Sequence, residues 1–121
     1  MDQRPKPRLQ SAVASKTIAT TGTVNATPNT LSAGTEGYVL DADLTTDAAS
    51  GGTVTIAAEY NGGANAGGTL SSSFQPIATS TGTAGGSGDV ITLVGKAAIA
   101  GDTPAAADYT DTWTIIGAGT F

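Results

Sequence analysis

The sequence predicts an all-β fold, either a small β-sandwich or a small barrel, with an extended N-terminal arm. Apolar and polar residues alternate with a period of two in several short segments. Glycine, asparagine and proline separate these segments at short intervals, as they do between strands. No apolar pattern with a period of 3.6 continues long enough for a helix.

The charge distribution divides the chain into an arm, residues 1–16, and a single β-domain, residues 17–121. The arm has one acid and four of the five basic side chains, and the body has nine acids and one base, Lys96. These side chains sum to +3 in the arm and −8 in the body, for a net charge of −5. Pro5 and Pro7 disfavour a helix in the arm. A basic arm on an acidic body indicates a chain that docks onto a partner.

Five segments are expected to form strands: residues 18–24, 38–44, 53–60, 90–94 and 109–116. The alternation is clearest in residues 53–60, where every second side chain is apolar. Residues 90–94 are apolar on both faces except at Thr92, which is typical of a central strand. The predicted core consists of Leu40, Val54, Ile56, Tyr60, Val90, Val94, Trp113 and Ile115.

The stretches between these strands are expected to be irregular. Residues 61–73 and 80–88 are rich in glycine and serine and predict long loops. Residues 102–107 predict a short helical turn, with Thr103 as the N-cap and Pro104 at the first helical position.

The core of this domain is expected to be thin. Only 26 of the 121 residues are larger apolar types, and no cysteine is present to form a disulfide. Burial against other subunits would supply the missing stabilisation, so we expect a homo-oligomer or a subunit of a larger assembly.

The residue types argue against an enzyme, and we expect no catalytic residue, cofactor or metal. Histidine and cysteine, the commonest general base and the thiol nucleophile, are absent. Asp41, Asp43 and Asp47 could offer oxygens to calcium, but Asp41 and Asp43 share the face of a predicted strand, and we interpret that face as solvated. Residues 85–89 contain glycines and an aspartate as calcium-binding repeats do, but we interpret them as a loop.

Neither nucleic acid nor a membrane is expected as a partner. Phosphate binding needs a positive surface, and the body is acidic. The sequence has no apolar run of about 18 residues and no apolar segment after the N-terminal bases, so we expect neither a membrane span nor a secretory signal.

Two parts of the chain are candidates for an assembly interface. The arm combines bases with apolar side chains, and aromatic residues, which are enriched in interfaces, gather near the C-terminus. The expected interface residues are Arg4, Lys6, Arg8, Leu9, Val13, Lys16, Tyr109, Trp113 and Phe121.

The C-terminal stretch 101–115, which contains Asp108-Tyr109-Thr110-Asp111-Thr112, resembles the last strand of alternate chaperone–usher pilins and spore-coat-U-type domains. Residues 21–27 (TGTVNAT) are similar to their first strand. The resemblance implies an immunoglobulin-like β-sandwich and a fimbrial subunit at the cell surface that polymerises by strand donation. The chain departs from that pattern because we expect no signal peptide in it and because it lacks the cysteines common in spore-coat-U-type relatives.

The whole chain also resembles the capsid decoration (cement) proteins of tailed phages, which are small, cysteine-poor β-domains rich in Ala, Gly and Thr with an N-terminal arm. This resemblance implies a virion protein made in the host cytoplasm. It also implies that the chain stabilises the shell by binding the major capsid protein or neighbouring structural subunits. We favour this interpretation, with the pilin-like subunit as the alternative.

Overall fold

The computed structural model describes residues 7–48 and 50–118, and this part of the chain is all-β, as predicted. Its single helical element is a short 3₁₀ turn, η1 (Ala58–Tyr60). The strands are β1 (Arg8–Ser11), β2 (Lys16–Ala19), β3 (Asn29–Thr30), β4 (Gly37–Thr46), β5 (Val54–Ile56), β6 (Ala66–Gly67), β7 (Ala78–Ser80) and β8 (Val90–Ala98).

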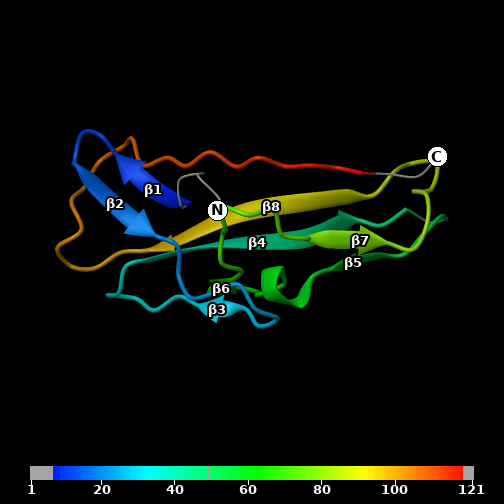
Figure 1. The fold of residues 1–121 in the computed structure, drawn as a ribbon, viewed down its shortest axis with the longest axis horizontal. Coiled ribbons are helices and arrows are strands. Elements are labelled where there is room, and N and C mark those ends of the chain that lie inside the picture. Colours follow the sequence, from blue (N-terminus) through cyan, green and yellow to red (C-terminus); the bar gives the residue numbers. More distant parts are fainter. Residues whose placement is uncertain (1–6, 49, 119–121) are drawn as a thin grey trace.

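The long antiparallel pair β4–β8 forms the centre of the molecule and runs along its longest axis (Figure 1). The pairing extends from Gly37 opposite Ala98 to Thr46 opposite Val90, with an irregularity after Leu44. The alternation in residues 38–44 and the apolar run 90–94 therefore correctly identified these two segments as strands. Both strands extend beyond the segments that the sequence predicted.

Three short antiparallel pairs surround the central one: β1–β2 at one end, β5–β7 toward the other, and β3–β6 beside β4 (Figure 1). Isolated bridges link Gln10 to Thr110, Leu40 to Gly68 and Gly51 to Ala84. Strand β6 and Gly68 lie within residues 61–73, which the sequence predicted to be a loop, so part of that stretch is instead paired with β3 and β4.

The hydrophobic core is small and lies on β4. Its centre consists of Leu40, Ala42 and Tyr60. Half-buried apolar side chains from several elements pack around it: Ile56, Ala57, Leu70, Ile77, Leu93 and Trp113. Ile18, Tyr38 and Val39 are also buried.

The predicted core is partly correct. Leu40 and Tyr60 are buried, and three further members are half-buried: Val54, Ile56 and Trp113. The prediction is wrong for Val90, Val94 and Ile115, whose exposed fractions are 49%, 39% and 68%.

Ile115 is exposed because the expected last strand does not form, and Val90 and Val94 lie on a strand that has only one strand neighbour among the described residues. In residues 109–116 only Thr110 makes a β-bridge, to Gln10, and the remainder has no ladder. Within the described residues β8 therefore has a single strand partner, β4. A strand with one neighbour is an edge strand, so the apolar run 90–94 does not lie in the centre of a sheet.

The expected strand 53–60 ends at Ile56, where the chain turns into η1. The turn carries Tyr60 into the core, where its ring lies against Gly68. A side chain at position 68 would collide with this ring, because a Cβ atom placed there would lie 2.3 Å from Tyr60 Cδ1. Burial raises the pKa of Tyr60 to about 12, so its hydroxyl keeps its proton and donates to the Thr69 carbonyl at 3.1 Å.

Residues 8–19 form a hairpin in which β1 pairs with β2 along its full length, so the expected boundary between arm and body after Lys16 falls inside it. The hairpin is anchored because Ile18 is 2% exposed and Gln10 exchanges two backbone hydrogen bonds with Thr110. The expected helical turn over 102–107 is absent, and Thr103 instead closes a turn with Ala100.

Candidate assembly interface

The expected interface residues fall into three groups in the structure. Arg4, Lys6 and Phe121 lie outside the described residues. Four others belong to the β1–β2 hairpin: Arg8, Leu9, Val13 and Lys16. Tyr109 and Trp113 belong to the C-terminal segment, residues 109–118, which runs along β8 in Figure 1.

The tip of the hairpin is fixed by Asp108. Its carboxylate accepts hydrogen bonds from the Ser11 hydroxyl, from the backbone N–H of Ala12 at 2.9 Å and from that of Val13 at 3.1 Å. These donors, with Ser11 first, lower the pKa of Asp108. The Val13 side chain itself is 81% exposed, so it is available for contact with a partner.

Lys16 is occupied within the chain. Its ammonium lies 2.9 Å from the Glu36 carboxylate, which also accepts a hydrogen bond from the Thr103 hydroxyl at 2.7 Å. The hydrogen bond to Glu36 raises the pKa of Lys16, and the same contact lowers the pKa of Glu36. Lys16 therefore ties the hairpin to two loops of the body.

Leu9 is far from Tyr109 and Trp113 in sequence, but the three residues line one pocket of about 250 Å³ (the side-chain pocket). Tyr38 and Asp111 also line it. The Trp113 indole N–H donates to the Tyr38 hydroxyl at 2.6 Å. Burial raises the pKa of Tyr38, and the nearby Asp111 carboxylate raises it further, so the phenol stays neutral.

Of the residues that line this pocket, sequence reasoning predicted only Leu9, Tyr109 and Trp113 as site residues, and it missed the others, including Tyr38 and Gly95. Trp113 lies so close to β8 that a Cβ atom at position 95 would be 2.8 Å from its Cζ2 atom. An isolated glycine inside an apolar strand often marks a close approach of this kind, so Gly95 carried a signal that could have been used.

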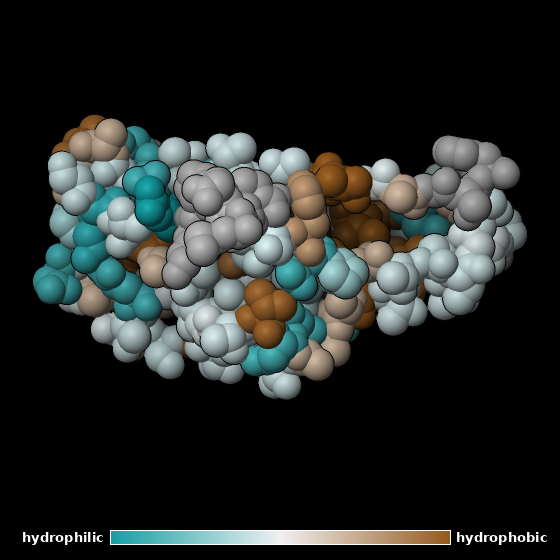
Figure 2. All heavy atoms as spheres, in the orientation of Figure 1, coloured by the Kyte–Doolittle hydropathy of each residue, from teal (hydrophilic) through white to brown (hydrophobic). Residues whose placement is uncertain are grey.

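A second feature of the surface is a group of exposed apolar side chains (the apolar strip). Figure 2 shows hydrophobic side chains gathered where the C-terminal segment crosses the β8 region. The strip comprises Ile91, Ile115 and Ile116, with exposed fractions of 38% to 68%. Val90 and Val94 are also exposed, but they point to the other face of β8. Contiguous exposed apolar side chains on a soluble protein mark interaction surfaces.

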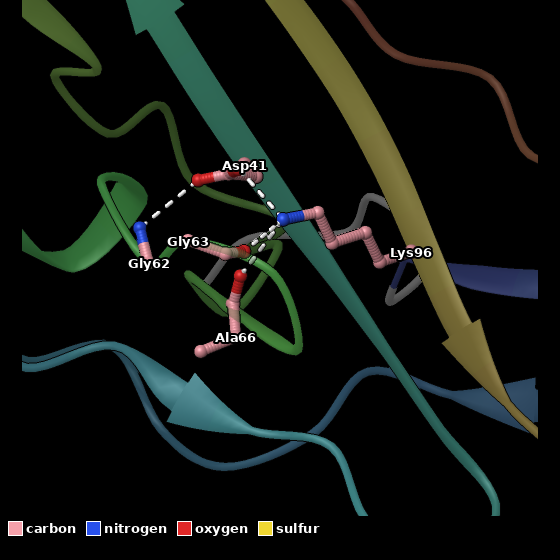
Figure 3. Close-up of polar contacts among 5 residues, drawn as sticks. All are labelled: Asp41, Gly62, Gly63, Ala66 and Lys96. Carbon is pink, nitrogen blue, oxygen red and sulfur yellow. Dashed lines mark hydrogen bonds and ion pairs between the residues drawn. The ribbon is translucent and has the colours of Figure 1, made fainter.

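Lys96, the only base of the body, reaches across β4 (Figure 3). Its ammonium lies 2.7 Å from Asp41 Oδ2 and donates to the carbonyls of Gly63 and Ala66, the latter at 3.4 Å. Asp41 Oδ1 accepts the N–H of Gly62 at 2.9 Å. Burial opposes ionisation of Asp41, but Lys96 and Gly62 outweigh it and lower the pKa of the carboxyl.

The interpretation of Asp41 as part of a solvated strand face is therefore wrong. Its residue is 3% exposed because residues 62–66 fold over this face of β4 and bond to Asp41 and Lys96. Asp43, two residues further along the strand, is exposed as expected.

In residues 7–48 and 50–118, no group of three or more acidic side chains is arranged to hold a metal ion. The same residues include no helix long and apolar enough to cross a membrane. The chain matches no protein-family model, no curated protein and no solved structure.

Proposed function

We propose that this chain is a non-enzymatic structural protein that becomes a stable part of a larger protein assembly. On the resemblance of the whole chain, the assembly we favour is a phage virion, in which the chain decorates and stabilises the capsid shell. The observation that carries the structural role is the apolar strip.

The strip supports association because burying its apolar side chains against another protein surface would stabilise the complex. Burial of apolar surface stabilises by roughly 25 cal/mol per Å². The strip residues are 38% to 68% exposed, so an interface could still bury part of their apolar surface.

An enzymatic interpretation would depend on Lys96 as the base. The environment of Lys96 instead supports a structural role for this residue. A Ser or Thr nucleophile needs a free basic neighbour. The Lys96 ammonium is bound to Asp41 and to two carbonyls of the 62–66 loop. It acts as a clamp for that loop.

Sedimentation velocity on the full chain tests the proposal. We expect the wild type to self-associate as its concentration rises, and Ile115→Asp to remain monomeric, because the substitution places a charge at a 68% exposed position within the strip. Val24→Asp is the matched control, because Val24 is an exposed apolar residue (42%) that lies outside both the strip and the expected interface residues. A wild type that is monomeric at every concentration, or equal loss in both variants, would contradict a role for the strip.

A pilin-like subunit is the second candidate, and the C-terminal segment favours it. Residues 111–118 are mainly exposed and have no strand pairing in the described part of the chain, although they run beside β8. An unpaired segment next to a strand edge is suited to pairing with another copy.

Mass spectrometry of the protein isolated from its native source distinguishes the two candidates. A chain that begins at or near Met1 supports assembly in the cytoplasm, as for a capsid protein. A product cleaved after Ala14, or a longer precursor with an apolar leader, supports export and the pilin-like subunit.

A further inference from the structure

The loop that folds over β4 begins with a reactive pair of residues, Asn61 and Gly62. The chain has four asparagines, Asn25, Asn29, Asn61 and Asn65, and only Asn61 is followed by glycine. Asparagine side chains are thermolabile, because the backbone nitrogen of the next residue can attack the side-chain carbonyl carbon. A Cβ atom on that next residue hinders the attack, whereas glycine has none and takes up the required backbone conformation freely. Asn61 is therefore the asparagine of this chain most prone to this reaction.

The surroundings of Asn61 leave its side chain free to react. The residue is exposed and directly follows η1. Its side-chain amide makes no hydrogen bond to other groups in residues 7–48 and 50–118. The amide of Asn25, in contrast, donates to the Thr23 hydroxyl and accepts the Thr27 N–H. The carbon that would be attacked is thus accessible and unrestrained at position 61.

The attacking nitrogen, in contrast, is held by Asp41 (Figure 3). The Gly62 N–H donates to Asp41 Oδ1 at 2.9 Å, and Lys96 binds the other carboxylate oxygen at 2.7 Å. Although burial opposes ionisation of Asp41, Lys96 and Gly62 lower its pKa, so the carboxylate is a weak base and leaves the proton on Gly62. Gly62 is also closely packed, because a Cβ atom there would lie 2.4 Å from the Ala66 carbonyl carbon. The folded loop therefore restrains the nitrogen, and local opening releases it.

We propose that Asn61 is a deamidation site and that the release of Gly62 from Asp41 sets the rate of its modification. The Gly62 nitrogen bonds to the side-chain carbonyl carbon of Asn61. The bond from that carbon to its amide nitrogen breaks, and ammonia leaves with the proton from Gly62. Water then opens the resulting succinimide at either carbonyl, which leaves aspartate or isoaspartate at position 61. No group is oxidised or reduced, and water is the only co-reactant.

Either product weakens the contact between the loop and β4. Each places a negative charge beside Gly62, whose N–H the Asp41 carboxylate accepts, and like charges repel. Isoaspartate also adds an atom to the main chain before Gly62, which moves this N–H away from Asp41. The modification therefore loosens the loop that Lys96 clamps. This inference does not rest on the assembly role.

Peptide mass spectrometry on the full chain, incubated at mildly alkaline pH, tests the proposal. The mass identifies the replacement of the amide NH₂ by OH, and chromatography separates isoaspartate from aspartate. We expect Asn61 to be modified in the folded wild type, and at least about fivefold faster in concentrated urea, where the loop is open. Asn65 is the internal control, because it is exposed in the same loop but is followed by Ala66. We expect Asn65 to react more slowly than Asn61 in both conditions.

Lys96→Met removes one side of the clamp, and we expect it to accelerate the modification of Asn61 at least about threefold. Lys16→Met is the matched control, because it removes a lysine whose ion pair is with Glu36, and it should keep the wild-type rate. Circular dichroism checks that both variants are folded. If Lys96→Met is not, wild type in urea below its unfolding transition replaces it and should show the same acceleration.

Four results would overturn the proposal. They are an unmodified Asn61 in the folded chain, equal rates in the folded and unfolded chains, a rate at Asn65 equal to that at Asn61, and no acceleration when the clamp is weakened. None of these measurements depends on the self-association of the chain, so this proposal and the assembly role can fail separately.

Discussion

Asp41 is the charged residue whose environment most constrains the fold. Its side chain is 4% exposed, and both carboxylate oxygens are engaged, one by Lys96 and one by Gly62. Removing one member of such a pair leaves the other charge buried without compensation, which costs more than the pair itself contributes. The contact also connects β4, β8 and the 62–66 loop, so its loss affects three segments.

We expect Lys96→Met to destabilise the protein by about 3 kcal/mol, because it leaves the Asp41 carboxylate buried and unpaired. Lys16→Met is the control, since its ion pair with Glu36 is solvent-accessible and such pairs contribute little to stability. Urea unfolding followed by circular dichroism measures both. Similar losses in the two variants would mean that the Lys96 contact is no stronger than a surface pair.

Asp41 also gives a pH dependence with a defined sign. Its pKa is lower in the folded protein than its ordinary value of 3.8. A lowered folded-state pKa contributes stability that is present above the unfolded value and is lost as the pH falls through the folded one. We expect stability to fall below about pH 4, and Asp41→Asn to flatten this part of the profile. Urea midpoints between pH 7 and pH 2 provide the measurement, and a profile unchanged by the substitution would contradict it.

The sequence alone could not show that Asp41 is buried and Asp43 is exposed. Both are aspartates at alternate positions of one strand, and period-two reasoning gives them the same environment. The difference arises from residues 62–66, about 20 positions further along, which fold over only one of the two. Burial that depends on such a distant loop has no local pattern in the sequence.

Among the elements, the β1–β2 hairpin depends on the C-terminal half for its position. The Asp108 carboxylate receives three donors from its tip, and Gln10 bridges to Thr110. We expect Asp108→Ala to loosen the hairpin without unfolding the centre. Hydrogen exchange should become faster for the amides of residues 9–19, while those of β4 and β8 keep their protection.

Asp102→Ala is the control for this experiment, because Asp102 is an exposed acid on a neighbouring turn. Unchanged exchange in the hairpin of the Asp108 variant would show that strand pairing and Ile18 hold it without Asp108. Faster exchange throughout the molecule would show that the hairpin belongs to the central folding unit.

The elements differ in how well the sequence predicted them. Strands β4 and β8 were predicted because alternation in one and an apolar run in the other are local signals. Residues 109–116 show the same alternation, yet only Thr110 pairs. Alternation indicates that a segment can form a strand. It does not indicate whether the edge of another strand lies close enough in the fold for the segment to pair with it. The pocket was only partly predicted for the same reason: Tyr109 and Trp113 were expected at an interface, but the meeting with Tyr38 depends on the path of the chain.

For the whole molecule, the small core and the apolar strip predict that stability depends on protein concentration. If copies associate through the strip, the folded state gains free energy by mass action and the unfolded state does not. We expect the melting temperature of the wild type to rise with concentration in calorimetry, and that of Ile115→Asp to stay constant. A constant wild-type value would mean that the isolated chain is stable with the strip uncovered.

The contact between Ser11 and Asp108 joins residues 97 positions apart in the chain. During synthesis, Ser11 leaves the ribosome long before Asp108 has been added, so this contact cannot form until translation is nearly complete. Closing so large a loop also slows its formation during refolding, because the loop entropy is lost before the contact forms. The tip of the first hairpin is therefore fixed late, and a chain that stops short of Asp108 lacks the carboxylate that holds it.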